Sequence, residues 1–127
     1  MKREFVPYEQ ALELRTIGFD EECIMYYSDS LNGYTLKSSD YWYSNSHWMF
    51  NADDNKDRHL MCTAPLYQQA FRWFREEYST SQYVQKFETK FFCCVHDGNS
   101  WSAETFDTYE EAELACIKKL IEIAKNK

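Results

Sequence analysis

The segment FFCCVHDGNSWSAETFDTYEEAELACIKKLIEIAK, residues 91–125, decides the class of fold. Two stretches rich in strand-forming residues flank a turn signal, DGNS at residues 97–100. The second half predicts a helix over Tyr109–Lys125, because Thr108 and Glu111 form a capping box and apolar residues then recur at helical spacing. A hairpin followed directly by an amphipathic helix is typical of an antiparallel sheet covered by helices.

Two further helices are predicted upstream of this segment. The first covers about Tyr8–Ile17, with Pro7 at its beginning and Gly18 as a left-handed stop. The second covers about Ala64–Tyr78, where the Thr63 hydroxyl is expected to cap the first turn.

The apolar pattern between the helices changes to that of strands. Turn signals at residues 31–33 and 44–46 join the first four strand-like stretches into two hairpins. The strand-like stretches are residues 23–27, 34–37, 41–43, 47–50, 83–87, 91–95 and 101–105. We therefore expect one α+β domain over residues 1–127, with an antiparallel sheet of about four to six strands covered by three helices.

Length and composition exclude several classes of protein. The chain has 127 residues, 44% apolar and 28% charged, as in an ordinary globular domain. A disordered tail, a collagen-like repeat and a coiled coil are excluded on these values. Aromatic residues reach 18%. Because rings serve the core as well as binding sites, an aromatic cluster alone is a weak indication of function.

The net charge restricts the partners. Lys and Arg number 14 against 21 Asp and Glu, a formal net charge of −7. Such a surface repels phosphate backbones and disfavours non-specific nucleic-acid binding. The longest unbroken apolar run, residues 91–95, is far too short to cross a bilayer, and the N-terminus lacks the apolar stretch of a signal peptide. We expect a cytoplasmic protein without a membrane partner.

The five cysteines are expected to be buried free thiols. Their number is odd and no CxxC pair exists, so no disulfide framework is indicated. Cys93 and Cys94 are adjacent, so on a strand they point to opposite faces. Cys116 falls on the apolar stripe of the last helix.

Two sets of residues have the spacing of metal ligands. Asp53, Asn55 and Asp57 match the first half of a calcium loop, but Arg58 stands where the tight turn needs glycine. We interpret this segment as a solvated acidic loop. A zinc site would need two close pairs; the pairs the chain offers are His59 with Cys62 and Cys93 with His96. Separate core or surface residues are the favoured interpretation, and no metal or cofactor is predicted.

No motif of a catalytic site is present. The chain contains no G-x-S-x-G elbow, no glycine-rich phosphate loop and no H-E-x-x-H sequence. No catalytic residue is therefore named, and a non-enzymatic protein is favoured. A small hydrolase or nuclease stays an alternative, because Cys and His partners meet in space rather than in sequence.

Binding residues are predicted on the second hairpin and the second helix. Rings left exposed on one face of the hairpin would suit a protein-interface anchor or base stacking. Two arginines one helical turn apart would offer a cationic spot to phosphate or carboxylate. These residues are Tyr41, Tyr43, His47, Trp48, Arg72 and Arg75. The alternative is that the rings pack under the sheet and both arginines are solvated.

Three helical blocks resemble a family of small uncharacterised proteins in phages and prophages of Bacteroidetes. They are FVPYEQALEL at 5–14 with the GFD at 18–20, TAPLYQQAFRWFRE at 63–76, and YEEAELACIKKLIEI at 109–123. The resemblance covers roughly a third of the chain and none of the strands. It carries no catalytic residues, but it implies a phage or prophage accessory protein acting in the bacterial host cell.

Three functions follow as hypotheses. The first is a non-enzymatic protein that inhibits a host defence protein by binding its surface. The second is a protein that sequesters a small nucleotide serving as a host defence signal, and the third is the small hydrolase or nuclease. Leu114, Ile117 and Ile121 lie beside the main apolar stripe of the last helix, which indicates either a homodimer contact or a helix buried on two sides.

Overall fold

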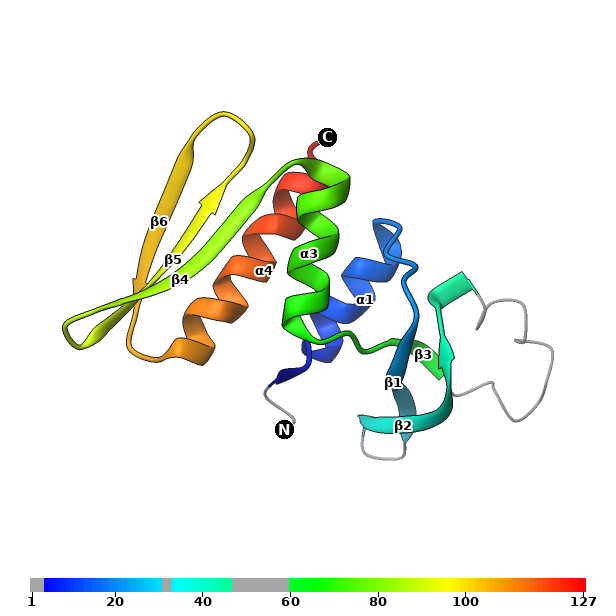
Figure 1. Ribbon diagram of the computed structural model, residues 1–127. Coiled ribbons are helices and arrows are strands. Elements are labelled where there is room, and N and C mark those ends of the chain that lie inside the picture. Colours follow the sequence, from blue (N-terminus) through cyan, green and yellow to red (C-terminus); the bar gives the residue numbers. More distant parts are fainter. Residues whose placement is uncertain (1–3, 31–32, 47–59) are drawn as a thin grey trace. The chain divides into compact units, whose positions relative to one another are not determined.

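The computed structural model describes residues 4–30, 33–46 and 60–127 (Figure 1). The chain divides into two compact units, one formed by residues 5–65 and the other by residues 1–4 and 66–127. Each unit holds one three-stranded antiparallel sheet. None of the helices in these described ranges is long and apolar enough to cross a membrane.

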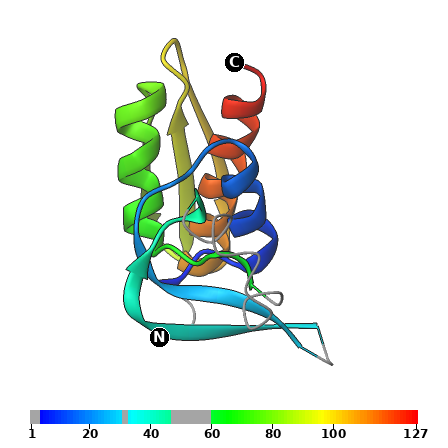
Figure 2. The same ribbon diagram turned by 90° about the vertical axis from the view of Figure 1, so that its right-hand side faces the viewer.

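Among its described residues, the unit of residues 5–65 includes a long hairpin, a short third strand and the helix that precedes them. The elements are α1 (Tyr8–Thr16), β1 (Cys23–Ser30), β2 (Gly33–Tyr43) and β3 (Leu60–Thr63). The strand order is β2-β1-β3, and Figure 2 shows β1 and β2 as a long twisted ribbon. The hairpin predicted around residues 31–33 is confirmed.

The end of α1 follows the prediction. Gly18 has a φ of 104°, a conformation that glycine adopts without steric cost. Its N–H donates to the carbonyl of Arg15 at 3.2 Å, and the N–H of Phe19 donates to the carbonyl of Leu14 at 2.9 Å. These two bonds form a Schellman motif, which satisfies carbonyls that the helix end would leave unpaired.

Buried hydrogen bonds connect the beginning and the end of this unit's chain segment. The hydroxyl of Tyr27 donates to the carbonyl of Val6 at 2.6 Å, and the N–H of Val6 donates to the carbonyl of Pro65 at 2.9 Å. The Tyr8 ring meets the Tyr27 ring edge-on, with 5.5 Å between the centroids. Val6 is thereby attached to β1 and also to Pro65 at the other end of the unit.

The second predicted helix begins later than expected. Thr63 is the last residue of β3 and pairs with Tyr26, so it does not cap a helix. The N–H of Ala64 then donates to the carbonyl of Met25 at 2.9 Å, and the helix starts only at Tyr67. Pairing with β1 satisfies these backbone groups and outweighs the local helix signal.

The second predicted hairpin is wrong in its first half. Residues 41–43 are the end of β2, where Tyr43 pairs with Cys23, and not a separate strand. Asn45 and Ser46, expected in the turn, are helical. Residues 47–50, the expected return strand, lie outside the described residues.

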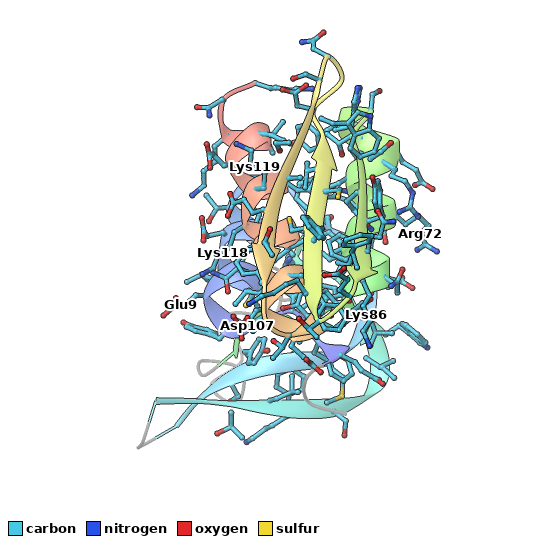
Figure 3. All side chains as sticks on the ribbon, turned by 90° about the vertical axis from the view of Figure 1, so that its left-hand side faces the viewer. Glu9, Arg72, Lys86, Asp107, Lys118 and Lys119 are labelled. Carbon is cyan, nitrogen blue, oxygen red and sulfur yellow. The ribbon has the colours of Figure 1, made fainter. Side chains whose placement is uncertain are left out.

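The second unit is a two-layer arrangement. Its elements are α3 (Tyr67–Tyr78), β4 (Ser81–Phe87), β5 (Lys90–His96), β6 (Trp101–Phe106) and α4 (Tyr109–Lys125). The strand order is β4-β5-β6; α4 contacts all three strands and α3, and α3 contacts β4. Both helices lie on one face of the sheet (Figure 3).

The last helix has the predicted bounds and cap. Thr108 accepts a hydrogen bond from the N–H of Glu111 at 3.1 Å, as the capping box requires. The additional apolar residues Ile117 and Ile121 are buried together with the main stripe. Because α4 contacts both the sheet and α3, a helix covered on two sides accounts for them. The homodimer stays a prediction.

The α+β class and the antiparallel pairing are confirmed, but the single sheet is not. In the described chain β1 pairs with β2 and β3, and β5 pairs with β4 and β6. The described strands thus form two three-stranded sheets, one within each unit, in place of the expected single sheet. The expected single domain over residues 1–127 stays a prediction.

Candidate functional site

The β4–β5–β6 sheet has one face covered by helices and one face that is not. Strand residues alternate between the faces, and directly paired residues share a face. The Cys93 sulfur contacts that of Cys116 on α4 at 3.0 Å, so its face is the covered one. The residues of the opposite face include Tyr83, Phe87, Phe92, Cys94, His96 and Trp101, which we call the outer aromatic face.

Three large rings of this face are open to solvent. The exposed fractions are 45% for Tyr83, 61% for Phe87 and 54% for Trp101. Exposed large apolar side chains scattered singly need no explanation, but these three share one face of one small sheet. Exposed apolar side chains grouped in this way are typical of interaction surfaces.

The rings of Tyr83, Trp101 and His96 are held in place by contacts with one another. The Tyr83 and Trp101 rings meet edge-on with centroids 5.3 Å apart, and the His96 ring lies 5.0 Å from the Trp101 ring. Aromatic pairs in this geometry gain about 0.5–1.5 kcal/mol beyond burial. A surface ordered before binding loses less conformational entropy when a partner arrives.

Cys94 lies beneath these rings on the central strand. It is buried although it belongs to the outer face, whereas the adjacent Cys93 points to α4. The prediction that the two thiols point to opposite faces is therefore confirmed. A hydrogen bond with the Cys94 thiol raises the pKa of Tyr83 above its ordinary value.

The outer aromatic face is nearly free of formal charge. Lys90 is the charged residue among the outward positions of these three described strands, and it forms an ion pair with Asp107. The outward positions of the sheet are Ser81, Tyr83, Gln85, Phe87, Lys90, Phe92, Cys94, His96, Trp101, Ala103 and Thr105. Depletion of charge is typical of the centre of a protein interface, whereas binding of phosphate backbones requires several cations.

The turn before β6 is fixed by side-chain hydrogen bonds. The Asp97 carboxylate accepts from the N–H of Ser100 at 2.9 Å and from the N–H of Asn99 at 2.8 Å. These bonds lower the pKa of Asp97. Gly98 has a φ of 102°, so the predicted turn is confirmed and sets the position of Trp101 directly after it.

Of the residues predicted to bind a ligand or partner, the structure places the two arginines together on one helix. Arg72 and Arg75 are exposed on α3, and Figure 3 shows Arg72 pointing away from the helix. Tyr41 and Tyr43 belong to β2 in the other unit, and their side chains lie outside the described residues. His47 and Trp48 lie outside them entirely, so the aromatic-hairpin hypothesis stays a prediction.

The predicted metal patterns fall largely outside the described residues. Asp53, Asn55, Asp57 and His59 lie there. Within the described part of the chain no group of three or more His, Cys, Asp and Glu side chains could hold a metal ion.

Sequence reasoning missed the rings at Tyr83, Phe87 and Trp101. A signal was present, since residues 91–95 are apolar on both faces of the strand. Helices on one side of a sheet can cover only one of these faces. The assignment also needed the strand register, which decides which positions of β4 and β6 share the uncovered face.

A cavity of about 420 Å³ lies at the N-terminal end of α4. Its lining includes three carboxylates, Glu4, Glu110 and Glu113, beside Tyr109. Burial raises the pKa of Glu113, although a hydrogen bond with Tyr109 acts in the opposite direction. An acidic lining alone does not identify a ligand, but the buried carboxyl makes the stability depend on pH.

We expect Glu113→Gln to stabilise the protein at pH 7. A folded-state pKa above the unfolded value means that the folded chain binds the proton more tightly. The wild type therefore loses stability as the pH rises through the pKa of the folded carboxyl, whereas the glutamine variant does not. Thermal unfolding of both proteins from pH 3 to 8 should show a higher melting temperature for the variant at pH 7. This difference should vanish below about pH 4.

The control for this prediction is Glu111→Gln, at an exposed carboxylate two residues earlier in the same helix. Glu111 also takes part in the helix cap, so its variant is expected to gain no stability at pH 7. A lower melting temperature of Glu113→Gln at pH 7 would contradict the prediction.

Comparison of the chain with protein-family models, curated proteins and solved structures finds no match.

Proposed function

We propose that this protein is a non-enzymatic binding protein of a phage or prophage that inhibits a host defence protein. It would act in the bacterial cytoplasm, and it would contact the host protein through the outer aromatic face. The observation that carries the proposal is the exposure of Tyr83, Phe87 and Trp101 on one face of the sheet, on which Lys90 is the charged residue among the described strand positions. The phage context comes from the sequence resemblance alone.

The chemistry of this face indicates the kind of surface it would bind. Trp and Tyr are over-represented among the residues that dominate binding energy, and they act at the desolvated centre of an interface. The partner should therefore offer an apolar pocket or patch. Because the chain has a net charge of −7, a basic rim around that patch would speed association.

We expect Trp101→Ala to weaken host-protein binding by a factor of about 30 or more, since central aromatic anchors contribute about 2 kcal/mol or more. Trp101 is half exposed at the beginning of an edge strand, so the variant should remain folded. Tagged protein would be incubated with lysate of a Bacteroidetes host and recovered without denaturation. Native mass spectrometry would then give the mass of any bound molecule, and titration with the recovered host protein would give the affinity.

The matched control is Trp42→Ala. Trp42 is 61% exposed on β2 in the other unit, next to the residues of the predicted aromatic hairpin. Wild type and Trp42→Ala should bind the host protein equally. If Trp42→Ala loses the partner and Trp101→Ala keeps it, the outer aromatic face is the wrong surface. A small-mass adduct in place of a protein would favour nucleotide sequestration, in which Arg72, Arg75 or lysines would neutralise the phosphates.

A further inference from the structure

The second unit contains a pair of buried thiols that the proposed function does not use. Cys93 on β5 is 5% exposed and Cys116 on α4 is fully buried. Their sulfur atoms lie 3.0 Å apart. A disulfide bond measures about 2.05 Å, so an approach of about 1 Å would join them. We propose that Cys93 and Cys116 are an oxidation site that closes to an intramolecular disulfide on reaction with a small hydroperoxide.

The two thiols are not equivalent. The Cys116 thiol donates a hydrogen bond to the Cys93 sulfur. This bond lowers the pKa of Cys93, although burial and Glu104 act against it, and nearby Lys119 adds to the lowering. The same bond and burial raise the pKa of Cys116. Because the thiolate is the nucleophile, Cys93 attacks the oxidant and Cys116 resolves the product.

The reaction balances with hydrogen peroxide as the oxidant. The Cys93 thiolate attacks one peroxide oxygen, the O–O bond breaks, and Cys93 sulfenic acid and hydroxide form. The Cys116 sulfur then attacks the Cys93 sulfur, so that the S–S bond forms and the S–O bond breaks. The leaving hydroxyl takes the Cys116 proton and departs as water. Two thiols and one peroxide thus become one disulfide and two waters, with one electron lost by each sulfur.

The other cysteines are placed differently. Cys94 is one residue away, but it lies on the opposite face of β5 and bonds with Tyr83. Cys23 and Cys62 belong to the unit of residues 5–65. Burial raises the pKa of Cys62 to about 12, so this thiol remains protonated and unreactive.

The bridge would connect α4 covalently to the central strand, between residues 23 positions apart. Closing such a loop restricts the unfolded chain and stabilises the folded one. We therefore expect the oxidised protein to melt at a temperature higher by about 5 °C or more.

The test uses the full chain, reduced, freed of reductant and treated with hydrogen peroxide. The protein would then be denatured, its free thiols alkylated, and its intact mass and peptides measured. We expect two fewer alkylated thiols than the five of the reduced protein. A peptide pair linked through Cys93 and Cys116 should appear and be cleaved by dithiothreitol. Cys94→Ala should behave like the wild type, and Cys116→Ala should form no bridge.

Three outcomes would overturn the proposal. They are alkylation of all cysteines after peroxide, irreversible addition of oxygen to Cys93 without a bridge, and a bridge between other cysteines. If Cys116→Ala fails to fold, the peptide map of the oxidised wild type still shows whether the bridge between Cys93 and Cys116 forms. These readouts need no host protein, so they are independent of the proposed function.

Discussion

Phe74→Ala is expected to lower the free energy of unfolding by about 3–5 kcal/mol, the largest effect of a single substitution that we predict. The Phe74 side chain on α3 is completely buried. Its ring packs against Trp73 with centroids 5.0 Å apart and against Tyr78 at 5.9 Å. Removing the ring loses this burial and leaves a cavity that the neighbouring rings fill only in part. Urea unfolding followed by circular dichroism measures the loss.

Phe87→Ala is the matched control for this prediction. The same ring is removed, but Phe87 is 61% exposed on β4. Its loss should change the free energy of unfolding by about 0.5 kcal/mol or less. Equal destabilisation by the two variants would mean that the burial assigned to Phe74 is wrong.

The second large effect is expected for Asn45→Ala. Asn45 is 4% exposed, and its side-chain amide bridges two backbone groups of the unit of residues 5–65. Its Nδ2 donates to the Phe19 carbonyl at 2.8 Å, and its Oδ1 accepts from the Thr63 N–H at 2.9 Å. Alanine removes both of these buried hydrogen bonds, and the loss of one partner of a buried hydrogen bond costs about 1–3 kcal/mol. We expect a total loss of about 2–4 kcal/mol in urea unfolding.

Two further variants make this prediction specific. Asn45→Asp can still accept from Thr63 but presents no donor to the Phe19 carbonyl, so it should also destabilise the protein. Asn99→Ala, in the exposed turn before β6, should cost about 0.5 kcal/mol or less. In Asn45→Ala the amide hydrogen of Thr63 should exchange faster than in the wild type. Unchanged exchange there would contradict the role of Asn45.

The residues around Asn45 also show how a polar group near the surface is stabilised. The Asp20 carboxylate accepts from the Ser46 N–H at 2.6 Å and from the Ser46 hydroxyl at 2.7 Å. Partial burial acts to raise the pKa of Asp20, but these bonds outweigh it and the pKa is lowered. Asp20 therefore stabilises the folded state while it is ionised, and its contribution is lost as the pH falls through the folded-state pKa.

The sequence by itself determined the elements whose signals are local. The cap of α4 needs only Thr108 and Glu111, three residues apart, and the hydrogen bond between them follows from that spacing. Gly18 ends α1 because glycine alone adopts its positive φ without steric cost. The Asp97 turn is likewise complete within four residues. Each of these motifs satisfies its backbone groups without help from distant parts of the chain.

Only the tertiary structure decided where the strands belong and which face of a sheet stays open. Thr63 carries a helix-cap signal, yet pairing with Tyr26 and the hydrogen bond from its N–H to Asn45 keep it in a strand. The exposure of Trp101 depends on the face of β4–β5–β6 that α3 and α4 cover. Local pattern cannot give either result, because the energies involved come from contacts between residues that are distant in the sequence.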